Sequence, residues 1–248
     1  MKQSVKLVAG NWKMNGVAAD LTEVAALRQA LSDTPPACRV ALCPPATLIE
    51  RLARDAGALI ETGGQDCRAE AKGAFTGGVS AAMLKDAGAT LVIVGHSERR
   101  QEFGESDALV ALKAEAAIEA GLEPIVCVGE TLAQREAGEA VEVVRRQVMN
   151  SLPLAAAGRP FAIAYEPVWA IGTGLTPTLE QIEEVHRAVR SAMIERLGLA
   201  AATPPILYGG SVKPDNARDI LAVPEVGGAL VGGASLKAAD FLAIIEAA

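Results

Sequence analysis

Residues 5–16 of the 248-residue chain have the sequence VKLVAGNWKMNG. The short apolar run at 5–9 is typical of a buried strand, and the turn after it carries Asn11 and Lys13. A doubly wound open sheet, the main alternative α/β architecture, usually has a GxGxxG turn after its first strand. The segment lacks that spacing, so we favour a closed barrel over an open sheet.

Seven further apolar runs follow, and helical patterns lie between them. Like residues 5–9, they are continuously apolar, which is typical of parallel strands buried on both faces. Eight strand-then-helix units in about 250 residues have the size of one closed barrel. We therefore expect a single-domain α/β (β/α)8 TIM barrel over residues 1–248. The seven runs lie at 39–43, 59–62, 90–94, 124–128, 161–165, 206–208 and 228–231.

Helices are predicted from apolar periodicity and from capping signals. The clearest periodic segments are 21–31, 108–120, 139–150 and 179–197. Three residue pairs have capping-box spacing just before such periodicity, and each predicts a helix start. These pairs are Asp20 with Glu23, Thr47 with Glu50, and Thr178 with Gln181.

Composition narrows the class of protein. Hydrophobic residues make up 50% of the chain, and the formal net charge of −7 argues against nucleic acid as a partner. No apolar stretch is long enough to cross a membrane, and the N-terminal run is too short for a signal peptide, so we expect no membrane partner. The sporadic cysteines fit a reducing compartment, so we expect a cytoplasmic enzyme. They form no CxxC pair and no zinc set with the two histidines, so no metal or other cofactor is expected.

Unusual polar residues and glycines come just after the predicted strands. In a barrel all of these loops open on one face, so the residues should converge there. Surface polar residues scattered at random would not favour one end of each strand. The set comprises Asn11, Lys13, Gln65, His96, Glu130, Glu166, Ser211, Gly232 and Gly233.

Glu166 and His96 are candidates for proton transfer. A half-desolvated carboxylate at a strand end tends toward a raised pKa and suits a general base, although the position of Glu166 fits a salt-bridged structural glutamate equally well. The hydroxyl of Ser97 can cap a helical turn. The N-terminus of that turn would keep the His96 imidazole neutral, so that the ring donates a hydrogen bond. A lone histidine is more often structural, and we expect His186, within its predicted helix, to be structural or on the surface.

Lys13 and three glycine-rich loops are candidates for anion binding. An ammonium fixed at a strand end suits a phosphate or an oxyanion, whereas an ordinary lysine would be solvated. The loops at 171–174, 209–211 and 231–235 contain glycines, which let backbone amides approach a phosphate. The loops after strands seven and eight are the usual phosphate site of a barrel. Residues 167–175 place apolar side chains in a loop, which predicts a hinged lid or a loop packed permanently on the barrel rim.

Seven motifs together resemble the triosephosphate isomerase family. They occur in the family order and span nearly the whole chain, and several are specific to the family on their own. They are GNWKMN at 10–15, GAFTG at 73–77, VGHSERR at 94–100, CVGET at 127–131, YEPVWAIGTG at 165–174, YGGSV at 208–212 and VGGASL at 231–236.

The resemblance implies a function and a set of roles. The reaction would be interconversion of D-glyceraldehyde 3-phosphate and dihydroxyacetone phosphate through an enediolate, in glycolysis and gluconeogenesis. Glu166 would be the base, neutral His96 would polarise the carbonyl, and Lys13 and Asn11 would stabilise negative charge. The implied phosphate-binding residues are Asn11, Lys13, Gly172, Ser211, Gly232 and Gly233, with Glu98 and Cys127 as supporting residues.

The resemblance also implies a homodimer. The loop at 73–78 would dock into the partner near its site, with Thr76 reaching toward the partner's Asn11 and His96, and with Gln65 at the same contact. Two rival functions stay open. One is another phosphate-binding barrel enzyme, such as a sugar-phosphate isomerase or a Schiff-base aldolase, although Glu166 occupies the strand end where an aldolase would want a lysine. The other is a non-catalytic barrel protein that binds a phosphometabolite.

Overall fold

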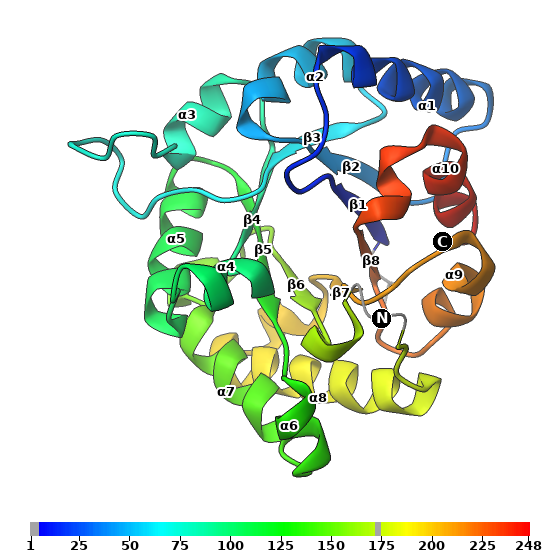
Figure 1. The fold of residues 1–248 in the computed structure, drawn as a ribbon. Coiled ribbons are helices and arrows are strands. Elements are labelled where there is room, and N and C mark those ends of the chain that lie inside the picture. The colour runs from blue at the N-terminus through cyan, green and yellow to red at the C-terminus, as the bar shows by residue number, and fades with distance from the viewer. Residues whose placement is uncertain (1–4, 172–174) are drawn as a thin grey trace.

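Eight parallel strands close into a barrel in the computed structural model, which describes residues 5–171 and 175–248 (Figure 1). Each strand pairs with its neighbours in the chain, and β1 pairs with β8 to close the ring. The predicted (β/α)8 fold is thus confirmed. The strands are β1 (Leu7–Asn11), β2 (Arg39–Cys43), β3 (Glu61–Gly64), β4 (Leu91–Val94), β5 (Glu123–Val128), β6 (Ala162–Tyr165), β7 (Ile206–Tyr208) and β8 (Gly228–Val231).

Two strands lie two residues further along the chain than predicted. β1 begins at Leu7 because Val5 is 58% exposed and precedes the barrel. β3 extends to Gly64, through two glycines that the prediction left out of the strand. These glycines allow close packing, since a Cβ at Gly63 would come 2.4 Å from Leu91. The shift makes Asn11 the last residue of β1.

Helices surround the barrel, as Figure 1 shows. All four helices predicted from periodicity are present, with ends that differ by at most two residues. No helix in the described part of the chain is long and apolar enough to span a bilayer. The helices are α1 (Leu21–Asp33), α2 (Ile49–Ala56), α3 (Ala81–Asp86), α4 (Ser97–Glu102), α5 (Asp107–Glu119), α6 (Leu132–Glu136), α7 (Ala140–Ser151), α8 (Leu179–Leu197), α9 (Pro214–Leu221) and α10 (Ala238–Glu246).

Of the three predicted capping boxes, the one at Thr178 and Gln181 forms and starts α8. The box predicted at Asp20 is wrong, because the Asp20 carboxylate accepts a hydrogen bond from the Val17 amide in the preceding 3-10 turn. The box predicted at Thr47 is also wrong. Thr47 lies within a second 3-10 turn, η2 (Ala46–Leu48), and α2 begins after it.

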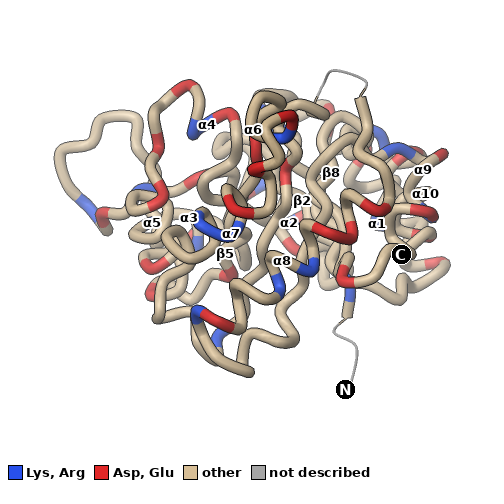
Figure 2. The backbone as a smooth tube through the Cα atoms, turned by 90° about the horizontal axis from the view of Figure 1, so that it is seen from below, with Lys and Arg blue, Asp and Glu red and all other residues tan. Residues whose placement is uncertain are grey.

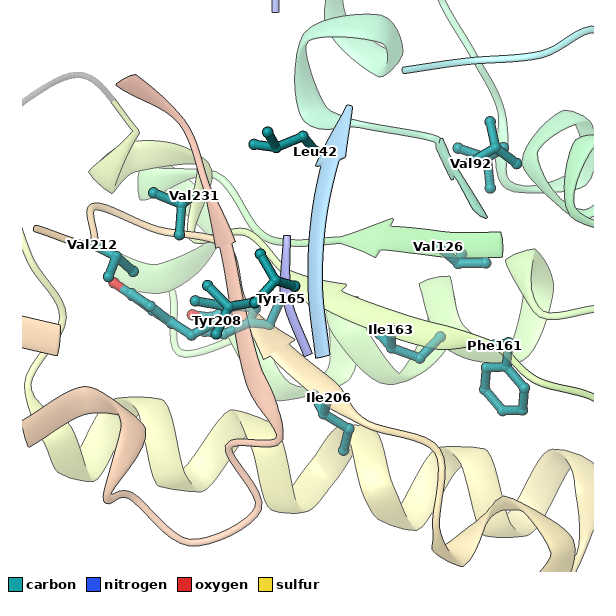
Figure 3. Packing of buried hydrophobic residues seen from close by; sticks show 14 of the residues in the cluster. Leu42, Val92, Val126, Phe161, Ile163, Tyr165, Ile206, Tyr208, Val212 and Val231 are labelled. Carbon is teal, nitrogen blue, oxygen red and sulfur yellow. The ribbon is translucent and has the colours of Figure 1, made fainter. Parts of the chain in front are cut away.

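Side chains of the strands divide the core into two layers. Because successive residues of a strand point to opposite faces, one set fills the barrel and the other packs against the helices. Figure 3 shows part of the outer layer, including Val126, Ile163 and Ile206. The inner layer contains small and branched residues: Leu7, Ala9, Ala41, Cys43, Leu91, Ile93, Ile125, Cys127, Ala162, Ala164, Leu207 and Leu230.

Charged residues close the amino end of the barrel. Arg39, the first residue of β2, makes ion pairs of 2.8 Å with Glu61 and 2.7 Å with Glu123, each the first residue of its own strand. Elsewhere Lys and Arg are interspersed with Asp and Glu around the molecule (Figure 2). The carboxyl end, by contrast, is hollowed.

Candidate active site

A cavity of about 790 Å³ opens at the carboxyl ends of the strands. It brings together side chains and loops that follow five of the strands, as predicted, but Gln65 and Glu130 are not among its lining residues. Lys213 and Asp215 also line it, and sequence reasoning missed both, although a basic residue soon after Ser211 was a usable signal. The predicted residues that line it are Asn11, Lys13, His96, Glu166, Ser211, Gly232 and Gly233.

Glu166 faces the cavity because side chains alternate in direction along β6. Ala162 and Ala164 face the barrel interior, so residue 166 points the same way. Its side chain is buried, with the residue 1% exposed. Oε2 accepts a hydrogen bond of 2.8 Å from the Ser97 amide. Oε1 lies 3.0 Å from His96 Nε2, and both residues line the cavity.

The ionisation of Glu166 differs from the sequence expectation. Burial alone raises the pKa of its carboxyl, as predicted. The His96 ring, the Ser97 amide and the Lys13 ammonium outweigh burial and hold the pKa below its usual value. Glu166 is therefore a carboxylate in this arrangement, which is the form that accepts a proton.

Gly95 turns His96 toward the cavity. Gly95 adopts a φ of 67°, which breaks the alternation of β4 directly before the histidine and which L side chains rarely adopt. His96, rather than Ser97, is the cap of α4, and its Nδ1 accepts from the Glu98 amide at 3.2 Å. This corrects the expectation that Ser97 is the cap.

The hydrogen bond at Nδ1 fixes the tautomer of His96. Burial lowers the pKa of the imidazole, and the Glu166 carboxylate more than offsets this and raises it above its ordinary value. Protonation at Nδ1 would nevertheless set one donor against another, since the Glu98 amide can only donate. The ring is therefore neutral in this geometry, with its proton on Nε2 facing the cavity.

Lys13 is held in a strained backbone conformation. Its φ of 52° is uncommon for a residue with a side chain and costs on the order of 1 kcal/mol. Asn11 Oδ1 accepts from the Lys13 amide at 3.0 Å, and Gln65 Nε2 donates to the Lys13 carbonyl at 2.8 Å. Gln65 thus has a role within the chain that sequence reasoning missed, and its place at a dimer contact stays a prediction.

Glu98 and Cys127 lie where supporting residues were expected. Glu98 Oε1 is 2.6 Å from Lys13 Nζ, so it fixes the ammonium at the edge of the cavity. Cys127 lies inside the barrel behind Glu166 and lines, with it, a separate cavity of about 180 Å³. Burial raises the pKa of the Cys127 thiol, so it stays protonated and uncharged beside the carboxylate.

Two loops at the far side of the cavity present backbone groups. Ser211 and the Gly232–Gly233 pair line it, and a Cβ at Gly233 would meet no atom within 4 Å. Ser235 holds its loop in shape, since its hydroxyl donates to the Gly232 carbonyl at 2.7 Å. Gly172, the remaining glycine predicted to bind phosphate, lies outside the described residues.

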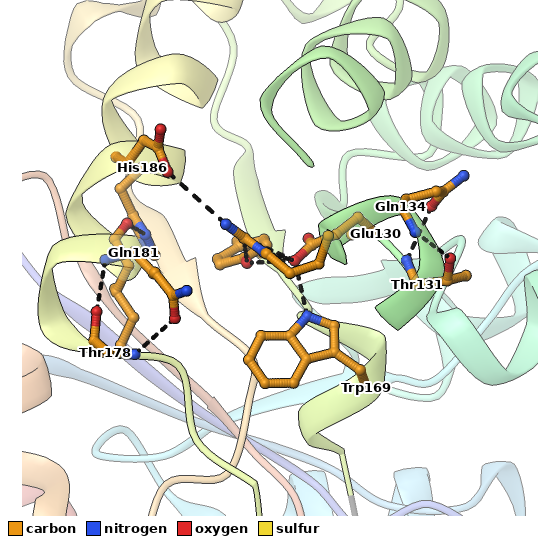
Figure 4. Close-up of polar contacts among 12 residues, drawn as sticks. Glu130, Thr131, Gln134, Trp169, Thr178, Gln181 and His186 are labelled. Carbon is orange, nitrogen blue, oxygen red and sulfur yellow. Dashed lines mark hydrogen bonds and ion pairs between the residues drawn. The ribbon is translucent and has the colours of Figure 1, made fainter. Parts of the chain in front are cut away.

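Glu130 lies elsewhere than predicted. It is fully buried but is not among the residues that line the large cavity. Its Oε1 accepts hydrogen bonds from Arg135 and, at 2.9 Å, from the Trp169 indole (Figure 4). Trp169 belongs to the 3-10 turn η4 (Val168–Ala170), so Glu130 anchors the described start of the predicted lid at 167–175 rather than facing the site.

Metal ligands are not grouped in residues 5–171 and 175–248: no three His, Cys, Asp or Glu side chains there are arranged to hold an ion. The groups that do converge, a carboxylate, a neutral imidazole and an ammonium, are those of general acid–base chemistry. The fold and this site together define a (β/α)8-barrel enzyme that works by proton transfer.

Comparison with known proteins identifies the family. The family model for triosephosphate isomerase matches residues 6–248. The triosephosphate isomerase of Caulobacter vibrioides is 61% identical over 97% of this chain and 96% of its own, and that of a Ruegeria species is 58% identical over 98% and 97%. The crystal structure of triosephosphate isomerase from Bartonella henselae superposes with a TM-score of 0.91 at 45% identity, covering 98% of both chains. The chain belongs to the triosephosphate isomerase family.

Proposed function

We propose that the cavity at the carboxyl end of the barrel interconverts D-glyceraldehyde 3-phosphate and dihydroxyacetone phosphate, with Glu166 as the base. The family membership supports the reaction, which is the isomerase step of glycolysis and gluconeogenesis. The observation that carries the assignment of the base is the buried Glu166 carboxylate on the cavity wall, with Oε1 3.0 Å from His96 Nε2.

Two groups would share the proton transfer. Glu166 removes the proton from the carbon beside the carbonyl and returns it to the neighbouring carbon. His96 faces the same space with Nε2–H, 3.0 Å from Glu166 Oε1, and donates to the substrate oxygens as the enediolate forms. The neutral ring suits this role, because it gives up a proton to one oxygen and takes one from the other.

Charge on the enediolate and the phosphate would be balanced by the rest of the site. Lys13 supplies a fixed ammonium, with Asn11 holding its backbone. Ser211, Gly232 and Gly233, together with Gly172, would offer amides to the phosphate. The overall charge of −7 does not oppose this, since charges beyond a Debye length of about 8 Å are largely screened.

Replacement of the base tests the proposal. In Glu166→Gln the amide keeps the shape of the side chain but cannot accept the proton, so turnover should fall by about 10²–10⁴-fold. Activity is measured by a coupled assay on chelator-treated protein, with the exposed Glu102→Gln as the matched control. Near-normal turnover by Glu166→Gln would mean that the base is misassigned. No turnover by folded wild-type protein would favour the non-catalytic phosphometabolite-binding alternative.

A homodimer is the proposed assembly. Residues 65–80 form the cyan segment that projects from the barrel in Figure 1, and within it Phe75 is 36% exposed and Thr76 is also exposed. Met14 and Phe103 are 96% and 65% exposed. Burial of these side chains by a partner would remove apolar surface from water, and Thr76 would then reach the partner's site.

The proposed location is the cytoplasm. All four cysteines are free and buried, and Cys43 and Cys127 fill the barrel interior as thiols. Cysteines used as small apolar core residues suit a reducing compartment. Detection of the enzyme in the soluble fraction of its own cells would test the location.

A further inference from the structure

Gln147, on α7 outside the barrel, makes two hydrogen bonds to a single residue after β5 (Figure 1). Its Oε1 accepts from the Gly129 amide at 2.7 Å, and its Nε2 donates to the Gly129 carbonyl at 3.1 Å. A side-chain amide can form such a pair because it carries a donor and an acceptor together. Both polar backbone groups of Gly129 are thus held by one side chain.

Gly129 in turn lies directly against the backbone of Glu166. A Cβ at Gly129 would come 1.7 Å from the Glu166 carbonyl oxygen, so no side chain fits between the two segments. On either side of this contact, Glu166 N donates to Val128 O at 2.7 Å and Val168 N donates to Glu130 O at 3.1 Å. Residues 128–130 therefore form a seat for residues 166–168.

The side chain of Glu166 has little room to compensate for a displaced backbone. A Cβ at Gly209, on the next strand end, would come 2.9 Å from Glu166 Cγ, and the Ser97 amide fixes one carboxylate oxygen. Movement of the seat would therefore move the carboxylate. Misplacement by about 1 Å can cost on the order of 10²-fold in rate.

We propose that Gln147 is a positioning residue for proton transfer, holding Glu166 in place through the backbone of Gly129. The inference rests on the proposed role of Glu166 as the base. Gln147 lines the smaller cavity behind Glu166 and is not among the residues of the large one. Its replacement should therefore affect the base while the phosphate-binding loops keep their shape.

The first test is Gln147→Ala, with Asn150→Ala on the same helix as the matched exposed control. We expect kcat to fall by about tenfold or more, with KM within about twofold of wild type. Competitive inhibition by inorganic phosphate should be unchanged, because the phosphate end is untouched. A kcat within twofold of wild type would overturn the proposal, as would a loss of phosphate affinity equal to the loss of kcat, which would indicate general structural damage.

Gln147→Glu provides a second readout that a merely structural role would not produce. The ionised carboxylate accepts from the Gly129 amide but cannot donate to the Gly129 carbonyl, whereas the protonated form can do both. The ratio of the variant's kcat to that of wild type should therefore rise as the pH falls from 8 toward the carboxyl pKa, near 4.3 or above. A ratio that stays flat would overturn the proposal even if Gln147→Ala fails to fold.

Failure of the inference and failure of the proposed function are separable. If Glu166→Gln keeps its turnover, the base is misassigned and Gln147 has nothing to position. If Glu166→Gln loses turnover while both Gln147 variants match wild type in kcat and in its pH dependence, the base is correct and the positioning role is wrong.

Discussion

Lys13 combines backbone strain with a charge for which we propose a catalytic role. The left-handed conformation, braced by Asn11 and Gln65, aims a side chain that would otherwise extend freely into solvent. Glu98 then fixes the ammonium at the cavity edge. The strain is thus offset by hydrogen bonds whose effect is to aim one charge.

Removal of that charge should cripple the enzyme. An ammonium about 4 Å from a substrate charge contributes on the order of 4 kcal/mol at an effective dielectric near 20, which corresponds to about 10³-fold. We therefore expect Lys13→Ala to lower kcat/KM by about that factor, measured in the coupled assay beside the exposed Lys72→Ala. Unchanged kinetics would make Lys13 an ordinary surface residue.

His186 shows the opposite use of a histidine. It was expected to be structural or on the surface, and it is fully buried in α8. Nδ1 lies 2.8 Å from the Ile182 carbonyl, and the ring meets Tyr165 edge to face. Because a carbonyl only accepts, Nδ1 carries the proton of the neutral ring. Burial lowers the pKa of His186 to about 4.

A depressed pKa makes His186 a source of acid sensitivity. Between these two pKa values the folded state binds fewer protons than the unfolded state. The contribution of the neutral His186 ring to the unfolding free energy is therefore fully present above the ordinary pKa of 6.5, and it is lost as the pH falls to about 4. The loss amounts to about 3 kcal/mol. His186→Phe keeps a ring against Tyr165 but cannot titrate. The difference in unfolding free energy between wild type and variant, measured by urea titration, should shift by that amount between pH 7 and 4. A constant difference would contradict the assignment.

At the scale of elements, α8 depends on its capping box. Thr178 Oγ1 accepts from the Gln181 amide, and Gln181 Oε1 accepts from the Thr178 amide (Figure 4). We expect Thr178→Ala to lower the unfolding free energy by about 1 kcal/mol, measured by urea titration. Thr47→Ala is the control, because Thr47 is exposed and its predicted box does not form. This variant should change the unfolding free energy by less than about 0.5 kcal/mol. Equal effects would mean that the box contributes nothing.

The strands and most helices could be predicted because their signals are local. Continuous apolar runs located all eight strands, and the convergence of Asn11, His96 and Glu166 followed from barrel topology alone. The capping predictions show the limit. The spacing at Asp20 matches that at Thr178, and only the backbone geometry of the preceding turn decides that Asp20 bonds Val17 instead.

The site was less predictable where a residue acts through a contact distant in sequence. Gln65 reaches Lys13 across 52 positions and Gln147 reaches Gly129 across 18, and nothing local to either glutamine indicates its target. Glu130 shows the reverse error, because its position after β5 predicted a place in the cavity, while Arg135 and Trp169 bind it away from there.

At the scale of the whole molecule, the segment at 65–80 projects from the barrel in Figure 1. Arg68 lies over the Phe75 ring at 4.0 Å and pairs with Glu70 at 2.9 Å, so the segment carries its own internal contacts. At its base lies a cavity of about 490 Å³. A preformed projection beside a cavity suits reciprocal docking of two copies about a twofold axis, because the same surface then serves both partners.

Thr76→Arg should separate assembly from folding. The added bulk and charge at this exposed position of the loop would block docking, so the variant should elute from a sizing column as a single chain of 25.5 kDa. Its kcat should fall by about tenfold or more, because the partner's Thr76 would no longer brace the site. Leu199→Arg, at a position 83% exposed in the turn η5 (Leu199–Ala202), adds the same charge elsewhere and should leave mass and kcat unchanged. A wild-type protein that elutes as a fully active monomer at every concentration would refute both the dimer and the role of Thr76.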